Sequence, residues 1–221
     1  MVEQLYILPI LLFSVVIHEI SHGLMALRLG DPTARDMGRL TLNPIPHIDP
    51  IGSIIVPLFS LMVAGRVMIA WAKPVPVNPL NFSKYRRDDI LVSVVGPISN
   101  MLLALCCTIV FIILFYLAAM VHGSSELADE GLAFLLKMFR GGISLNVVLA
   151  VFNMIPVPPL DGSHVVASML PDQVSERYRS LGFYGIFILL LLMRWQPFEM
   201  LFSFIIGALT FPFQSLIRLF I

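Results

Sequence analysis

A histidine-glutamate pattern with metal-ligand spacing lies in the first apolar stretch of the chain, at His18-Glu19-Ile20-Ser21-His22. In a helix, residues four apart lie one turn apart on the same face, so both imidazoles can reach one zinc ion. Glu19 is adjacent to the first histidine, where its carboxylate can flank a water molecule without being a ligand. Zinc activates such a water, and the carboxylate can accept its proton and pass it to a leaving amine. The pattern predicts His18 and His22 as metal ligands and Glu19 as the general acid and base.

The apolar surroundings of the motif favour a metal over an ordinary polar helix face. An ionisable side chain at mid-bilayer costs roughly 2.5–3.5 kcal/mol. Three such groups on one face therefore need each other, a metal or water. A cluster of hydrogen bonds between helices is the alternative interpretation.

A catalytic zinc of this type needs a third protein ligand and an open position. The candidates in this sequence are His47, Asp49, His122, Asp161 and His164. Asp161 is the strongest, because the three prolines within residues 156–159 interrupt a helix before it and Gly162 permits a sharp turn after it. A helix cap or an ion pair with Arg177 would also explain Asp161, whereas His164 suits an interfacial position better.

Two asparagines in apolar stretches are candidate substrate-binding residues. Asn153 can donate a hydrogen bond to a substrate carbonyl or a developing oxyanion. Asn100, in Gly96-Pro97-Ile98-Ser99-Asn100, can reach the same site. An ordinary bond between membrane helices explains Asn153 equally well, and helix packing is the simpler explanation of Asn100.

The composition excludes several classes of protein. Hydrophobic residues make up 58% of the 221 residues and charged residues 13%, against roughly 45–50% and 25% in soluble domains. The mean hydropathy is +0.91. Most of the surface must therefore face lipid, which excludes a cytosolic enzyme and a disordered chain. Fourteen basic and fourteen acidic residues leave no positive surplus for a nucleic-acid partner.

The distribution of apolar stretches predicts an all-α polytopic membrane protein with about five to six transmembrane helices. The clear stretches are residues 5–29, 90–121, 143–160, 181–193 and 198–221, and residues 51–71 are ambiguous. Basic residues accumulate in cytoplasmic loops. The basic loops 28–39 and 73–87 share one face only if 51–71 dips into the membrane and returns. We therefore expect five crossings and a re-entrant segment, with the N-terminus outside and the C-terminus in the cytoplasm.

Taken together, these residues resemble the site-2 protease family, the intramembrane zinc metalloproteases. Four local patterns match in family order and span about residues 14–165: His18 to His22, Lys73-Pro74-Val75-Pro76-Val77-Asn78, Gly96 to Asn100, and residues 153–162. H-E-x-x-H alone is weakly specific. Its combination with N-x-x-P-x-x-P-L-D-G in a membrane chain is highly specific.

The resemblance implies three core helices that hold one zinc ion per chain below the cytoplasmic surface, with His18, His22 and Asp161 as ligands and Glu19 as the acid and base. It also implies cleavage of a peptide bond in or near a transmembrane helix of a membrane-protein substrate. The stretch 66–77 resembles the small membrane-embedded β element of the family, which can pair with an extended substrate.

The resemblance is to the minimal branch of the family, because neither a PDZ nor a CBS domain fits in this chain. We expect one membrane-embedded domain over residues 1–221, with a catalytic core at about 5–165 and C-terminal helices at about 176–221. The expected location is the inner membrane of a prokaryote. The alternative is a metal-binding transporter or non-proteolytic membrane protein with broken helices, which leaves the carboxylate of Glu19 unexplained.

Overall fold

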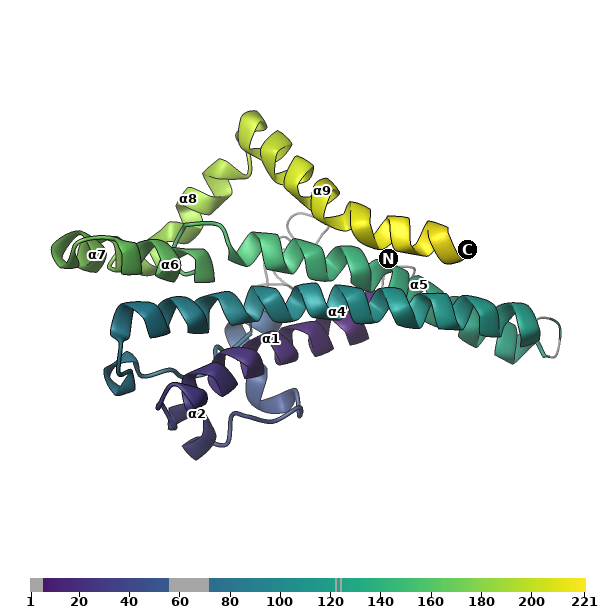
Figure 1. Ribbon diagram of the computed structural model, residues 1–221, viewed down its shortest axis with the longest axis horizontal. Helices are drawn as coiled ribbons and strands as arrows, with labels where there is room; N and C mark the ends of the chain where they lie inside the picture. The colour runs from purple at the N-terminus through teal and green to yellow at the C-terminus, as the bar shows by residue number, and fades with distance from the viewer. Residues whose placement is uncertain (1–5, 56–71, 122, 124) are drawn as a thin grey trace.

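The computed structural model of the protein describes residues 6–55, 72–121, 123 and 125–221. Helices dominate this part of the chain, which contains no β-strand (Figure 1). The elements in chain order are α1 (Leu8–Arg28), α2 (Thr33–Asp36), η2 (Ile45–His47), η3 (Pro50–Ile55), η4 (Pro79–Asn81), α4 (Tyr85–Val121), α5 (Glu126–Asn153), α6 (Asp161–Met169), α7 (Asp172–Arg179), η5 (Gly182–Tyr184), α8 (Gly185–Leu192) and α9 (Gln196–Phe220). The predicted all-α class is confirmed.

Four helices among the described residues are long and apolar enough to cross a membrane: α1, α4, α5 and α9. The shortest of them, α1, has 21 residues, and about 20 apolar residues span the hydrocarbon core of a bilayer. The chain is therefore an integral membrane protein. α1, α4 and α5 pack against one another along their lengths, and α9 packs against α4 and α5.

The predicted crossing at residues 181–193 is wrong. These residues form a short turn, η5, followed by α8, which has only eight residues. At 1.5 Å per residue, α8 extends about 12 Å, less than half of the ~30 Å hydrocarbon core.

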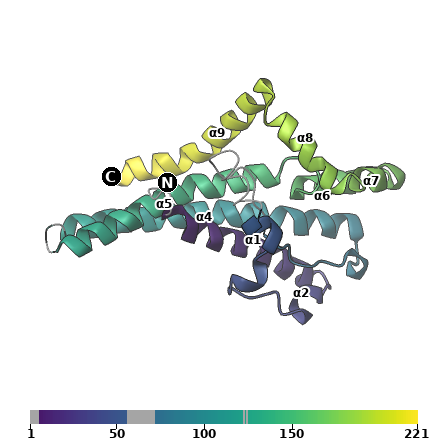
Figure 2. The ribbon, with the colours of Figure 1, turned by 180° about the vertical axis from the view of Figure 1, so that it is seen from behind.

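The two ends of the described chain lie at the same end of the helix bundle (Figures 1 and 2). Ile7 and Ile10, at the beginning of α1, belong to one apolar cluster with Phe213 and Ile217, near the end of α9. The beginning of α1 and the last turns of α9 therefore lie next to each other in the bundle.

The expected break in the helix before Asp161 is confirmed. α5 ends at Asn153 and α6 begins at Asp161, so the prolines of residues 156–159 all lie in the non-helical connection. Proline cannot donate a backbone hydrogen bond and clashes with the preceding helical turn, which explains why α5 stops here. α6 then packs against α4.

The re-entrant segment and the β element are not confirmed. Of residues 51–71, those from 56 onward lie outside the described residues, and Pro50–Ile55 forms one turn of π-helix. Residues 66–71 of the expected β element also lie outside them. Residues 72–77 are described as an irregular segment with no strand partner in the described part of the chain.

Candidate metal centre

The structure brings together the three side chains that the sequence predicts as metal ligands. His18 and His22 lie one turn apart on α1, both are buried, and their Nε2 atoms are 3.0 Å apart. Asp161, the first residue of α6, places Oδ2 3.1 Å from Nε2 of His18 and 3.4 Å from Nε2 of His22. The break between α5 and α6 is thus what presents this carboxylate to α1.

Hydrogen bonds at the far side of each imidazole determine which nitrogen carries the proton. Nδ1 of His22 lies 2.7 Å from the backbone carbonyl oxygen of Val92, and Nδ1 of His18 lies 2.5 Å from Oδ1 of Asn100. Both partners are acceptors, so each Nδ1–H donates. In the neutral rings the Nε2 atoms then present lone pairs to the site.

The orientation of the Asn100 amide is determined by a second asparagine. Nδ2 of Asn100 donates to Oδ1 of Asn146 at 2.9 Å, and Nδ2 of Asn146 donates to the carbonyl oxygen of Gly142 at 2.9 Å. A backbone carbonyl can only accept, so it fixes the orientation of Asn146, then of Asn100, and finally the proton position on His18. Both asparagines are fully buried.

This arrangement suits a cation. Two Nε2 lone pairs and a carboxylate oxygen converge, and Oδ2 of Asp161 is buried without a hydrogen-bond partner in the described part of the chain. All three atoms lie within 4.8 Å of one another. Three acceptors without a shared proton repel one another unless a positive ion lies among them. Two imidazoles and one carboxylate are also the ligand types of catalytic zinc sites.

Gly96 allows the backbone of α4 to approach the two imidazoles. A Cβ atom at this position would fall against Nε2 and Cε1 of His22 and Cε1 of His18. Any side chain there would therefore displace the ligands. Gly162 has a comparable role beside Asp161, because its Cβ would meet the backbone carbonyl of Met154.

A buried ion pair that the sequence analysis missed fixes α6 and α7 to α4. Asp89 on α4 is 4% exposed, and its Oδ2 accepts hydrogen bonds from Ser168 on α6 and Arg179 on α7, each at 2.7 Å. Arg179 also lies 3.0 Å from Nδ1 of His164. The signal in the sequence that could have revealed this ion pair is the acidic residue Asp89 directly before a long apolar stretch. The network holds the helix that begins with Asp161 against the helix that carries Gly96.

Glu19 lies beside the site and is oriented by the irregular segment 72–77. Its Oε2 accepts a hydrogen bond from the backbone N–H of Val75 at 2.7 Å. Arg39 holds the same segment by donating to the carbonyl oxygen of Lys73 at 2.9 Å. The hydrogen bonds among the described residues leave Oε1 of Glu19 uncommitted.

Comparison with known proteins agrees with this geometry. The model of the family described as peptidase family M50 matches residues 6–193. This chain belongs to the M50 peptidases. The resemblance to the site-2 proteases is therefore confirmed.

Two relatives of this M50 chain cover most of it. "Putative zinc metalloprotease YwhC" of Bacillus subtilis (strain 168) is 38% identical over 187 residues, which are 85% of this chain and 79% of the relative. "Putative zinc metalloprotease Rip2" of Mycolicibacterium smegmatis is 29% identical over 202 residues, 87% of this chain and 70% of the relative. No solved structure gives a significant match.

The remaining candidates of the sequence analysis lie elsewhere in this M50 fold. Asn153 donates from Nδ2 to the carbonyl oxygen of Leu149 in its own helix, at 2.9 Å. His47 is buried in its own loop, with Nε2 3.0 Å from the carbonyl oxygen of Thr41. Asp49 accepts backbone hydrogen bonds in the next turn. His122 lies outside the described residues.

Proposed function

We propose that this M50 peptidase is an intramembrane zinc metalloprotease that hydrolyses a peptide bond in or near a transmembrane segment of a membrane-protein substrate. The observation that carries the proposal is the convergence of Nε2 of His18, Nε2 of His22 and Oδ2 of Asp161, which all lie within 4.8 Å of one another. The two histidines belong to α1, one of the helices long enough to cross the membrane.

His18, His22 and Asp161 would hold one zinc ion per chain. When bound, zinc supplies the Lewis acidity that activates a water molecule for attack on a carbonyl carbon. Asn100 and the carbonyl of Val92 keep the two imidazoles in the tautomer that can bind a metal.

Glu19 would transfer a proton from the attacking water to the leaving amine. Its Oε2 is held by the N–H of Val75, so the carboxylate is oriented and Oε1 can accept a proton from the attacking water. The same group then donates that proton to the nitrogen of the leaving amine. A peptide bond inside a transmembrane helix is enclosed by its own helical hydrogen bonds, so we expect the substrate to unwind locally before attack.

The distribution of basic residues supports an orientation in the membrane. Six basic residues lie at the end of α1, at the beginning of α4 or in the connection between them: Arg28, Arg35, Arg39, Lys73, Lys84 and Arg86. By the positive-inside rule this side faces the cytoplasm, and the metal ligands are nearer to it. Because the ends of α1 and α9 lie together at the other end of the bundle, both termini are then outside. This orientation replaces the expected cytoplasmic C-terminus, in what we propose is a prokaryotic inner membrane.

The first test is the zinc content of detergent-purified wild type, Glu19→Gln and Asp161→Ala. We expect one zinc per wild-type chain, retained by Glu19→Gln. Loss of a hydrogen-bond partner of a ligand weakens metal binding about 10–100-fold, so removal of the Asp161 ligand should weaken it by at least about 100-fold. Equal zinc affinity in Asp161→Ala would contradict the ligand set.

The second test is proteolysis in membranes of cells that express wild type or Glu19→Gln. Newly formed amino termini, labelled chemically and identified by mass spectrometry, should arise within or beside transmembrane segments with the wild type only. If both proteins bind zinc and produce the same amino termini, the metal site is not proteolytic.

A further inference from the structure

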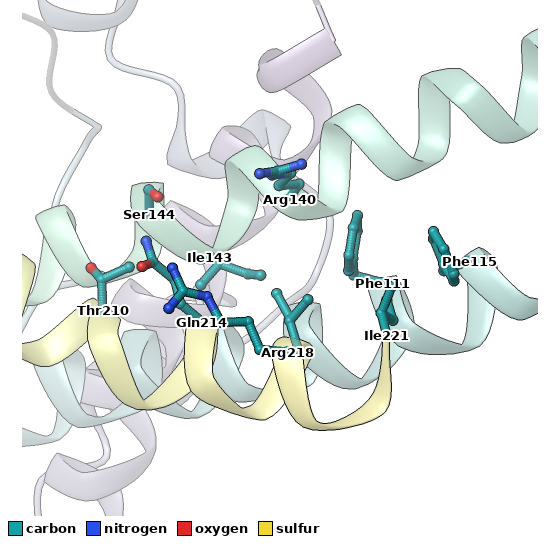
Figure 3. A pocket seen from close by; sticks show the side chains of 10 residues that line it. Phe111, Phe115, Arg140, Ile143, Ser144, Thr210, Gln214, Arg218 and Ile221 are labelled. Carbon is teal, nitrogen blue, oxygen red and sulfur yellow. The ribbon is translucent and has the colours of Figure 1, made fainter.

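A pocket of about 350 Å³ lies between α4, α5 and α9, in the half of the bundle away from the metal ligands (Figure 3). It contains an unusual number of polar side chains for a position between membrane helices. The polar residues that line it are Arg140, Ser144, Thr210, Gln214 and Arg218. None of its lining residues is acidic.

The polar residues form two facing stripes. Thr210, Gln214 and Arg218 follow one another at four-residue spacing on α9, and Arg140 and Ser144 have the same spacing on α5. Residues at this spacing share one face of a helix. In Figure 3 the side chain of Arg218 extends back along α9 toward Gln214, so its guanidinium lies over the stripe.

Arg140 and Arg218 are both exposed residues at the edge of the pocket. In the part of the chain that the structure describes, no hydrogen bond or ion pair reaches Arg140 or Arg218. Arginines within membrane segments normally pair with an anion or with backbone carbonyls. The side chains that line the pocket therefore carry two positive charges and no negative charge.

Thr210 provides an independent indication of a missing ligand. It is 6% exposed, and its hydroxyl is buried without a hydrogen-bond partner among the described residues. A helical threonine usually satisfies its hydroxyl with a carbonyl of the preceding turn. A buried hydroxyl left without a partner is unfavourable, and a polar group in the pocket would satisfy it.

We propose that this pocket binds the phosphate headgroup of an anionic phospholipid. Guanidinium groups bind phosphate oxygens in bidentate fashion, and hydroxyl and amide groups complete the set of donors. The other walls are apolar, with Phe111, Ile143 and Ile217 among them, and suit an acyl chain. Basic pockets between transmembrane helices on the cytoplasmic side of membranes bind anionic headgroups, and this pocket presents the same kinds of donors in the other half of the bundle.

The test uses the full chain, stripped of lipid in a non-ionic detergent. Dioleoyl phosphatidylglycerol, dioleoyl phosphatidylcholine and inorganic phosphate are added separately, and binding is followed by native mass spectrometry and by Tm. We expect phosphatidylglycerol to remain bound and to raise Tm more than the other two. An equal effect of phosphatidylcholine, or of phosphate alone, would overturn the proposal, because the site would then not select an anionic lipid.

Charge variants distinguish binding in this pocket from nonspecific electrostatic attraction between the protein and anionic lipid. In Arg140→Gln/Arg218→Gln, phosphatidylglycerol affinity should fall about fivefold for each arginine removed, the usual effect of one basic group beside anionic lipid. The matched control is Lys137→Gln/Arg194→Gln, which removes two exposed charges that do not line the pocket. An equal loss in the control would overturn the proposal.

Thr210→Val tests the pocket without changing its charge or shape. In lipid-free detergent this variant should be at least as stable as the wild type, because a methyl group replaces an unpaired hydroxyl. The rise in Tm caused by phosphatidylglycerol should be smaller than in the wild type. An undiminished rise in both this variant and the double arginine variant would overturn the proposal.

Discussion

Nδ1 of His18 lies 2.5 Å from Oδ1 of Asn100, although 82 residues separate the two in the chain. The amide of Asn100 is therefore committed on both sides, to His18 on α1 and to Asn146 on α5. The sequence predicts Asn100 as a group that touches substrate, whereas the structure supports a role in positioning the histidine. This chain of hydrogen bonds joins the helices α1, α4 and α5.

The first prediction concerns Asn100→Ala. Removal of the acceptor leaves Nδ1–H of His18 buried and unpaired, so the ring loses both its orientation and its preferred tautomer. Zinc affinity should fall about 10–100-fold, measured by competition with a chelator of known affinity. Asn100→Asp keeps the acceptor for His18 but loses the donor to Asn146, so it should restore only part of the affinity.

Asn153→Ala is the matched control for this prediction. The amide of Asn153 bonds only to its own helix among the described residues, so zinc affinity should not change. If Asn153 does contact substrate, its loss should instead lower kcat without affecting the metal. Equal weakening of zinc binding in the two alanine variants would contradict the positioning role of Asn100.

The second prediction concerns Gly96→Ala. The added Cβ falls against the imidazole of His22 and close to that of His18, so we expect loss of zinc binding even where the protein folds. The measurement is zinc per chain after purification, with circular dichroism to verify helix content. Gly131→Ala, also within a helix, adds a Cβ that meets nothing within 4 Å. It should retain zinc and be slightly more stable, because alanine favours helix by up to about 1 kcal/mol.

The third prediction concerns Asp89→Asn. This change removes the charge that pairs with Arg179, whose side chain is 27% exposed. Breaking such a buried pair from one side costs about 3 kcal/mol. We expect a lower Tm and weaker zinc binding, because α6 carries Asp161. Asp172→Asn breaks the ion pair with Arg86, in which Asp172 is 94% exposed, and should change neither quantity, since exposed pairs contribute little. Equal effects would contradict a specific role for Asp89.

Two local features of the candidate site could be predicted from the sequence, because local rules govern them. Helical spacing alone places His18 above His22, and prolines alone end α5 before Asp161. The bounds of α1, α4 and α9 follow the predicted apolar stretches closely for the same reason, whereas α5 begins at Glu126, well before the predicted stretch 143–160.

Non-local contacts and helix ends could not be predicted in this way. Asp89 meets Arg179 only because α6 and α7 fold back onto α4, which no local pattern encodes. The error at α8 has a related cause, since hydropathy measures composition and not helix length. The turn at Gly182, with a φ of +43°, delays the start of the helix, and α8 ends at Leu192, before a second turn.

The last prediction concerns Asp31, which joins the loop after α1 to the segment before α4. Asp31 is fully buried, and it accepts hydrogen bonds from Thr33, from the backbone N–H of Asn78 and from the side-chain amide of Asn81. Burial on its own raises the pKa of a carboxyl group, but these hydrogen bonds outweigh it and lower the pKa of Asp31.

The lowered pKa gives the stabilisation by Asp31 a definite pH dependence. The Asp31 carboxylate binds a proton at a higher pH in the unfolded chain than in the folded chain. Its full contribution to stability is therefore present above about pH 4, the ordinary pKa of an aspartate carboxyl. It is lost as the pH falls through the lowered pKa. The side chain of Asp31→Asn cannot ionise. Its amide also places an N–H group where the wild-type carboxylate has an oxygen that accepts a hydrogen bond. The variant should be about 1–3 kcal/mol less stable near neutral pH.

The measurement is Tm of wild type and Asp31→Asn in the same detergent from neutral pH down to about pH 3. The difference in Tm should be largest at neutral pH and should shrink below about pH 4. The other carboxylates titrate in both proteins, so their effects on Tm cancel when the two proteins are compared. Asp36→Asn, at a side chain that is 57% exposed, should follow the wild type throughout. A difference between wild type and Asp31→Asn that stays constant over the whole range would show that the charge of Asp31 does not contribute to stability.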